Sequence, residues 1–248
     1  INNAGALWEL AYSFADSTKE HLFITGKAGT GKTTFLRLLT ANSSKKNIVI
    51  APTGVAAMNA QGVTLNSFFQ IPPGYYLPVA SDMLNQGIFS LQNILTNINY
   101  SGKKKELIRN LESIIVDEVS MIRPDQIDII DEILRTVRNS NLSFGGVQLI
   151  LIGDLFQLPP VVSNESSITY GKFYTSGFFF NATAFKTSKL IQIEFEKIFR
   201  QTDERFVNIL NEIRTNTVTD SSLRELNDRY QPNFTPKEEE SFITLTSH

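Results

Sequence analysis

The sequence predicts an α/β fold in which helices cover both faces of a mainly parallel β-sheet. Short apolar runs recur at 22–24, 47–51, 113–116 and 147–152, and segments with helical periodicity separate them. Uninterrupted apolar strands are typical of sheets buried on both faces, and their alternation with helices favours parallel pairing. Turn residues follow each run directly. In such a sheet, ligands gather beyond the carboxyl ends of the strands.

The composition limits the classes of protein to which the chain can belong. Its 248 residues are enough to bury a core in one large domain or two small ones. It has no apolar run of about 18 residues and no secretory signal, so we expect no membrane association. With no cysteine and two histidines, disulfides and a cysteine or histidine metal centre are not expected, and an intracellular protein fits best. Because the net charge is −2, any nucleic acid must be held by a local groove.

A glycine-rich loop directly follows the first apolar run. It reads Gly26-Lys-Ala-Gly-Thr-Gly31-Lys32-Thr33, the complete phosphate-loop pattern, and a helical period begins at Phe35. The glycines let successive N–H groups converge on phosphate oxygens, and the N-terminus of the next helix adds positive charge. Lys32 can then reach the β- and γ-phosphates of a nucleoside triphosphate, and Thr33 can ligate Mg²⁺. The residues expected to hold the nucleotide are Gly26, Lys27, Ala28, Gly29, Thr30, Gly31, Lys32, Thr33 and Thr34.

Two later strands end in polar side chains that suit hydrolysis of a triphosphate. The run 113–116 ends in Asp117 and Glu118. We expect Asp117 to hold the Mg²⁺ shell and Glu118 to orient and deprotonate the attacking water. The run 147–152 leads into Gly153-Asp-Leu-Phe-Gln157-Leu-Pro-Pro, which places Gln157 to hydrogen-bond the γ-phosphate or the water. The acid pair favours hydrolysis over transfer to a small alcohol.

Small and hydroxyl-bearing residues follow the run 47–51. They are Pro52-Thr53-Gly54 and then Thr64-Leu-Asn66-Ser67-Phe68. Backbone and hydroxyl donors at a strand-to-helix turn can hold a phosphodiester, and an aromatic ring can stack on a base. Core packing is the alternative role for Phe68 and Phe69.

The rest of the chain is assigned mainly to structural roles. Residues 70–105 lack a strong period and contain several prolines, which predicts an irregular insertion with one helix near 83–97. The run Lys103-Lys104-Lys105 is either a solvated surface or a contact to a nucleic acid backbone. Arg200, at a strand-to-helix corner, is a candidate for reaching a transferred phosphate. Further helices are expected at 4–16, 124–138, 203–214 and 220–230, a strand at 189–195, and aromatic core material at 173–185.

Together these motifs resemble those of the RecD-related, Pif-type DNA helicases of superfamily one, over about residues 20 to 247. The resemblance implies a P-loop NTPase fold, namely the first RecA-like motor domain of an ATP-dependent DNA helicase, with 5′-to-3′ movement. Residues 1–235 would form this domain, and 236–248 a linker and the start of a missing second RecA-like domain. The motifs that carry the resemblance are 26–34, Ala51-Pro-Thr-Gly-Val-Ala-Ala57, Val116-Asp-Glu-Val-Ser-Met-Ile-Arg123, 153–160 and Phe199-Arg-Gln-Thr-Asp203.

The resemblance also implies site residues, cofactors and partners. ATP and Mg²⁺ would be the cofactors, and single-stranded DNA and the second RecA-like domain the partners of a monomeric protein. Its location would be the cytoplasm of a bacterium, or the nucleus or mitochondrion of a eukaryote. Asn66 stands where the family usually has histidine. The catalytic residues would be Lys32, Glu118, Gln157 and Arg200, and those along the DNA would be Pro52, Thr53, Gly54, Thr64, Asn66, Ser67 and Phe68.

Two other functions are compatible with the phosphate loop. One is a nucleotide-gated binding module without productive catalysis. The other is an AAA+-type remodelling ATPase, which shares the loop and the acid pair but is disfavoured by Gln157-Leu-Pro-Pro and by the lack of a recognisable helical lid. For the motor-domain hypothesis, we expect the isolated fragment to bind nucleotide, hydrolyse it slowly and unwind nothing.

Overall fold

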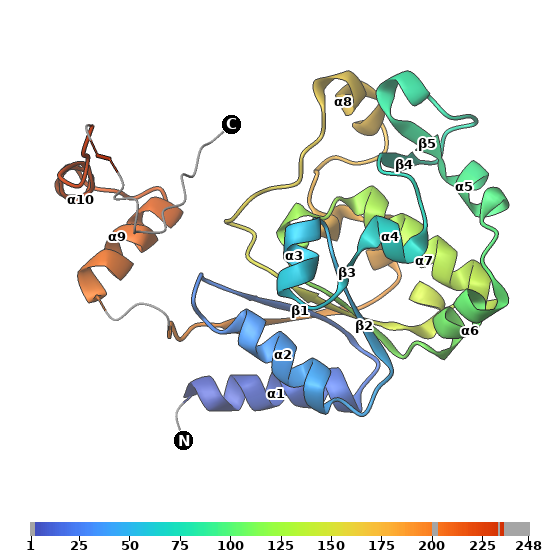
Figure 1. Ribbon diagram of the computed structural model, residues 1–248, viewed down its shortest axis with the longest axis horizontal. Coiled ribbons are helices and arrows are strands. Elements are labelled where there is room, and N and C mark those ends of the chain that lie inside the picture. Colours follow the sequence, from blue (N-terminus) through green and yellow to red (C-terminus); the bar gives the residue numbers. More distant parts are fainter. Residues whose placement is uncertain (1–2, 200–202, 233, 236–248) are drawn as a thin grey trace. The chain divides into compact units, whose positions relative to one another are not determined.

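Six parallel strands form the large sheet at the centre of the molecule (Figure 1). The computed structural model describes residues 3–199, 203–232 and 234–235, and the chain divides into two compact units, Ile1–Arg200 and Gln201–His248. In the sheet the strand order is β3-β2-β6-β7-β1-β8, and every neighbouring pair is parallel. This confirms the prediction of a mainly parallel α/β sheet. The strands are β1 (His21–Gly26), β2 (Asn47–Ala51), β3 (Val63–Thr64), β6 (Ser113–Val116), β7 (Gln148–Ile152) and β8 (Leu190–Phe195).

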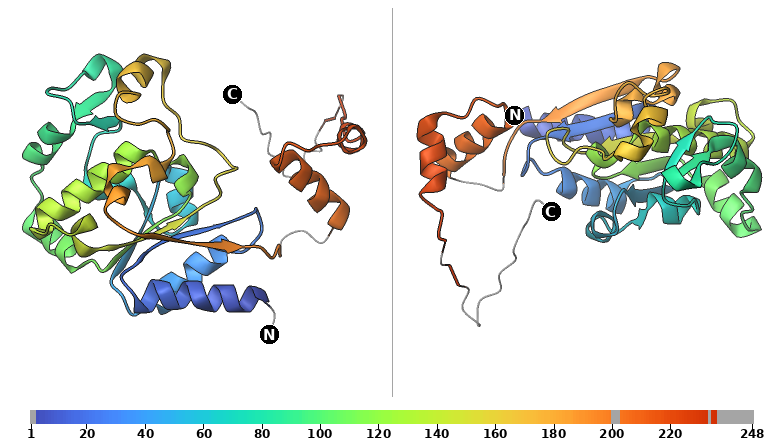
Figure 2. Two further views of the ribbon diagram at one scale, coloured as in Figure 1. Left: turned by 180° about the vertical axis from the view of Figure 1, so that it is seen from behind. Right: turned by 90° about the horizontal axis from the view of Figure 1, so that it is seen from above.

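Helices cover both faces of the sheet (Figures 1 and 2). Successive side chains of a strand point to opposite faces, so each buried strand serves two cores. In β1, Leu22 packs in one core with α1 (Asn3–Ser17) and α2 (Lys32–Asn42). Its neighbour Phe23 packs in the other core with α7 (Pro124–Arg138). This arrangement explains why consecutive residues in the middle of these strands are apolar.

The strand order brings three loops to one edge of the sheet. Strand β7 lies between β1 and β6 and pairs with both, with Ile24 beside Ile152 and Val116 beside Leu151. Because all three strands run in the same direction, the segments that follow them emerge side by side. These segments are the phosphate loop, the Asp117-Glu118 pair and the loop that carries Gln157.

The segment 70–105 is more regular than the sequence predicts. Its apolar residues Leu77 and Ile88 are fully buried against Tyr170 and Tyr174, which come from a distant part of the chain. Local periodicity cannot reveal a tertiary contact of this kind. The elements of this region are β4 (Tyr75–Leu77), η1 (Leu84–Gln86), β5 (Ile88–Ser90), α5 (Leu91–Asn97) and α6 (Gly102–Asn110), with β4 and β5 forming a small parallel sheet.

The other predicted elements agree with the structure in type, with differences in burial. Helix α7 buries the apolar residues that recur at helical spacing along it, namely Ile127, Ile130, Leu134 and Val137. In the aromatic stretch, Tyr174 and Phe179 are buried as predicted, whereas Phe173 and Phe180 are 40% and 49% exposed. The remaining short helices of this unit are α3 (Gly54–Asn59), α4 (Leu65–Phe69), η2 (Val119–Met121), η3 (Ser143–Gly146), α8 (Asn164–Tyr170), η4 (Phe179–Asn181) and η5 (Thr183–Lys186).

The second unit contains α9 (Glu204–Arg214) and α10 (Asp220–Asn227), close to the predicted helices. Asp203 and Thr219 cap them by accepting backbone N–H groups. The buried residue of α9 is Ile209. The predicted linker at 236–248 and the candidate Arg200 lie outside the described residues. Within the described residues, no helix combines the length and the hydropathy that a membrane span requires.

Candidate functional site

The phosphate loop adopts a conformation that depends on glycine. The φ angles of Gly26 and Gly31 are 153° and 88°, in the region that favours glycine. A Cβ at Gly26 would lie 2.5 Å from the carbonyl oxygen of Phe195, and a Cβ at Gly31 would lie 2.7 Å from the ring of Trp8. Trp8 stacks on Phe195 at 5.5 Å between ring centroids. The N-terminal helix α1 therefore packs against the loop through Trp8.

Lys32 begins α2 and folds back over the loop. Its Nζ donates hydrogen bonds of 2.7 Å to the Gly26 carbonyl oxygen and 3.0 Å to the Lys27 carbonyl oxygen. Gly31, the N-cap of α2, has no side chain to accept from the first turn of the helix. Exposed N–H groups at a helix N-terminus, together with an ammonium group, form a site for an anion such as a phosphate.

The two acids emerge from β6 with different environments. Asp117 is only 9% exposed, and burial raises the pKa of its carboxyl to about 6. Glu118 is partly exposed and has a φ of 50°, a left-handed conformation that is uncommon outside glycine. Such a backbone conformation costs about 1–2 kcal/mol and often marks a functional position. It lets the chain turn directly after Asp117 into η2.

Gln157 is held by Asp154, which sequence reasoning did not single out. Asp154 is buried; its Oδ1 accepts the Phe156 N–H at 3.1 Å, and its Oδ2 accepts from Gln157 Nε2 at 3.3 Å. The Gln157 N–H also donates to the Asp154 carbonyl oxygen at 3.0 Å. An aspartate directly after a buried strand and a glycine is the sequence signal for such a turn. Asp154 thus positions the exposed carboxamide.

These segments enclose one cavity of about 280 Å³. It joins the phosphate loop to Glu118 and Gln157, as the sequence predicts. It also includes Phe199, a residue that sequence reasoning passed over; its N–H donates to the Gly29 carbonyl oxygen at 2.8 Å, and its side chain is 55% exposed. The described residues that line the cavity are Ala28, Gly29, Gly31, Lys32, Thr33, Thr34, Glu118, Gln157 and Phe199.

The residues present fit a Mg²⁺ ion that is shared with a phosphate group. Thr33 has an exposed side chain at the cavity, and Asp117 is a buried carboxyl whose charged form is destabilised by desolvation. A cation would offset that desolvation. Within the described residues there is no cluster of three or more His, Cys, Asp or Glu side chains suited to a metal. The donor set therefore fits an ion that takes its remaining ligands from phosphate and water, as Mg²⁺ commonly does.

Replacing Asp117 by Asn should stabilise the nucleotide-free chain at neutral pH. The pKa of about 6 in the folded state exceeds the ordinary value of 3.8 for an aspartate side chain. The folded state therefore holds the proton more tightly, and the stability linked to this group is lost as the pH rises through about 6. The variant should exceed the wild type by about 1–3 kcal/mol near pH 7 and lose that advantage near pH 4. Thermal unfolding over this range measures the difference, and a difference independent of pH would contradict the assignment.

The candidate nucleic-acid residues occupy two neighbouring turns. Thr53 caps α3 by accepting the Ala56 N–H at 3.2 Å, and Thr64 caps α4 by accepting the Ser67 N–H at 3.2 Å. Thr64 pairs with Ala51, so the two turns follow adjacent parallel strands. Gly54 and Ser67 are exposed, and Pro52 is partly exposed. Thr53, Gly54, Thr64 and Ser67 can present hydroxyl and backbone N–H donors at these turns, next to the edge that carries the cavity. Pro52, which has no N–H, can offer only its ring and its carbonyl oxygen.

Two other residues of that predicted set face inward. The Nδ2 of Asn66 donates to the Tyr76 hydroxyl at 2.6 Å and to the Pro72 carbonyl oxygen at 3.1 Å, so its amide ties α4 to the insertion. Phe68 is 5% exposed and packs edge-on against Phe69. Of the two roles considered for Phe68, this geometry favours core packing, because a base cannot stack on a buried ring.

This fold and this cavity define a P-loop nucleotide-binding protein with a RecA-like sheet. The model of the PIF1-like helicase family matches residues 5–224. The chain belongs to the PIF1-like helicase family, and the family and fold predicted from the motifs are confirmed. Family membership also removes the AAA+-type alternative.

Individual relatives support the assignment. The chain is 35% identical over 210 residues to the ATP-dependent DNA helicase PIF1 of Candida albicans, covering 82% of this chain and 22% of that protein. It is 30% identical over 208 residues to the human protein of that name, covering 84% and 29%. A crystal structure of the Bacteroides Pif1 helicase with ADP-AlF3 and single-stranded DNA aligns with a TM-score of 0.85 at 40% identity, covering 100% of this chain and 54% of that one. The chain thus spans less than a third of these curated relatives.

Proposed function

We propose that this chain is the first motor domain of an ATP-dependent DNA helicase, spanning residues 1–235, and that 236–248 lead into a second RecA-like domain. The cavity that joins the phosphate loop, Glu118 and Gln157 supports this proposal most directly. Relatives that cover most of this chain are named as ATP-dependent DNA helicases, and one solved relative holds ADP-AlF3 and single-stranded DNA.

In this proposal the triphosphate lies along the phosphate loop. Lys32, which now contacts the carbonyl oxygens of the loop, would turn to the β- and γ-phosphates. Thr33 and Asp117 would hold Mg²⁺, which when bound neutralises phosphate charge. The exposed ring of Phe199 offers an apolar face to the base. The substrate thereby brings its γ-phosphate toward Glu118 and Gln157.

Hydrolysis would then depend on two side chains of the cavity. Glu118 takes the proton of the attacking water, and Gln157, held by Asp154, orients that water and senses the third phosphate. Arg200 follows Phe199 in sequence and completes the proposed catalytic set. An arginine supplied by a second domain can raise hydrolysis by about 10³- to 10⁵-fold, so this chain alone should turn over slowly and unwind nothing.

Single-stranded DNA would lie across the exposed turns of Pro52, Thr53, Gly54, Thr64 and Ser67. Phosphate oxygens would accept from the hydroxyl and backbone N–H groups of these residues other than Pro52, which has no N–H. Asn66 and Phe68 would support this surface from within rather than touch DNA. We also propose that the protein is a monomer. Its place would be the cytoplasm of a bacterium or the nucleus or mitochondrion of a eukaryote, because its proposed substrates are found there.

A binding experiment with this chain tests the nucleotide site. The change Lys32→Ala should weaken the binding of a fluorescent ATP analogue by about tenfold or more, because charge-assisted hydrogen bonds to phosphate are lost. Lys189→Ala, at an exposed position before β8, serves as the matched control. Equal affinities of the wild type and the Lys32 variant would contradict the proposed site. A binding module without catalysis would also bind ATP, so turnover is tested separately below.

A further inference from the structure

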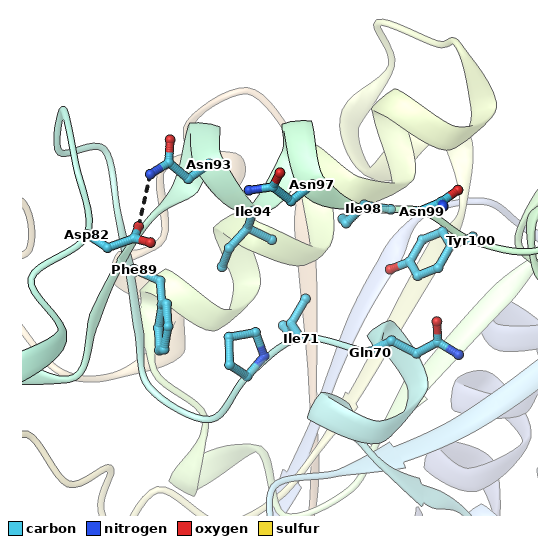
Figure 3. Close-up of a pocket in the computed structure, with 11 residues that line it drawn as sticks. Gln70, Ile71, Asp82, Phe89, Asn93, Ile94, Asn97, Ile98, Asn99 and Tyr100 are labelled. Carbon is cyan, nitrogen blue, oxygen red and sulfur yellow. Dashed lines mark hydrogen bonds between the residues drawn. The ribbon is translucent and has the colours of Figure 1, made fainter.

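A second cavity, of about 240 Å³, lies between the end of α4 and α5 (Figure 3). Its inner wall is apolar and includes Ile71, Phe89 and Ile94. Carboxamide side chains surround this wall. They belong to Gln70, Asn93, Asn97 and Asn99.

Most of these carboxamides are not used to hold the fold together. Asn93 Nδ2 donates to Asp82 Oδ1 at 3.2 Å, which fixes one side of the cavity. The side chains of Gln70, Asn97 and Asn99 make no hydrogen bond to any residue that the structure describes. Each therefore offers a donor and an acceptor to a ligand. A planar apolar body with donors and acceptors at its edge, such as a nucleobase, matches this lining.

A run of lysines stands directly after the cavity in the chain. Lys103, Lys104 and Lys105 lie in the first turn of α6, which has no acidic residue there. Within the described part of the chain, none of the three takes part in an ion pair. Three cations at the positive end of a helix are electrostatically unfavourable, and a phosphate would offset this cost.

Helix α4 connects the lysines and the cavity to the proposed DNA surface. Thr64 and Ser67 lie at its start, and Gln70 is its C-cap. Between them, the Nζ of Lys104 lies 3.5 Å from the ring centroid of Phe68. A helix of five residues is only about 8 Å long, so these groups lie within reach of consecutive nucleotides.

We propose that the cavity beside α5 receives one base of single-stranded DNA while Lys103 and Lys105 hold the neighbouring phosphates. The inference rests on the proposed function, because it extends the DNA surface beyond Ser67. Of the two roles that the sequence left open for the lysine run, a solvated surface and a contact to a nucleic acid backbone, the inference selects the contact. Asn97 and Asn99 contact the edge of the base, and the apolar wall takes its face.

An abasic scan tests the base site with this chain. Oligonucleotides that each lack one base at a successive position are compared with the intact strand. In the wild type, loss of the base at one position should weaken binding about fivefold or more. In the double variant Asn97→Ala/Asn99→Ala, that position should become insensitive to loss of the base. The matched control Asn141→Ala, an exposed residue remote in sequence from the cavity, should keep the wild-type pattern.

The salt dependence of binding tests the phosphate contacts. In Lys103→Ala and Lys105→Ala, the slope of log K against log salt should each fall by about 1, whereas Lys46→Ala, at an exposed position before β2, should keep the wild-type slope. Two results together would overturn the base site alone. Ser67→Ala would weaken the binding of the oligonucleotide, and the Asn97→Ala/Asn99→Ala variant would remain as sensitive as the wild type to loss of the base at that one position. If the wild-type chain bound no oligonucleotide, the proposed DNA function would fail together with this inference.

Discussion

The change Glu118→Gln should lower ATP turnover by about 10²- to 10⁴-fold, the usual contribution of a general base. Glutamine keeps the shape of the side chain but cannot take a proton from water. Glu118 lines the same cavity as Lys32 and Gln157. Turnover is best measured in a protein that includes the proposed second motor domain, where the wild-type rate should be high. The affinity of this chain for ATP should change little.

The control for this experiment is Glu194→Gln, an exposed carboxyl on the edge strand β8. This substitution removes the same negative charge from the chain at a residue that does not line the cavity. Unchanged turnover in the Glu118 variant would contradict the role of general base. If the longer wild-type protein showed no turnover at all, the nucleotide-gated binding module would be the better description.

The sequence predicts the sheet and the nucleotide cavity well, because both follow from local patterns. The four apolar runs and the segment 189–195 become strands, and the strand order places Glu118 and Gln157 beside the phosphate loop. The glycine spacing needs no tertiary information to be recognised. The residues of this site can therefore be predicted from their types and from their spacing in the sequence after each buried strand.

The features that the sequence does not predict depend on contacts between distant segments. Asn66 is a polar residue in an exposed-looking turn, yet its amide is held by Tyr76 and Pro72. Phe68 has the same local pattern whether it stacks on a base or packs in the core, and only the structure shows its burial. The insertion acquires regular structure because its apolar residues meet tyrosines from α8 and the turn that follows it.

A buried ion pair between Arg123 and Asp125 also depends on contacts between distant segments. Asp125, at the start of α7, is fully buried and accepts from Arg123 Nε at 2.9 Å. It also accepts the Tyr76 N–H at 3.0 Å and the Tyr170 hydroxyl at 3.1 Å. Arg123 in turn lies 4.5 Å from the ring centroid of Tyr75. One carboxylate thus joins the segment after Asp117 and Glu118 to the insertion and to α8.

Asp125→Ala should lower the free energy of unfolding by about 3–5 kcal/mol, because it leaves the Arg123 guanidinium buried without a counter-charge. Asp125→Asn should cost less, since its carbonyl oxygen can still accept from Tyr76. Removing both charges with Arg123→Met/Asp125→Leu should recover part of the loss, because two apolar groups leave no unpaired charge. Denaturant unfolding followed by the fluorescence of Trp8, the only tryptophan, measures all three variants. A double variant less stable than Asp125→Ala would show that the hydrogen bonds to Tyr76 and Tyr170, rather than the ion pair, hold the insertion in place.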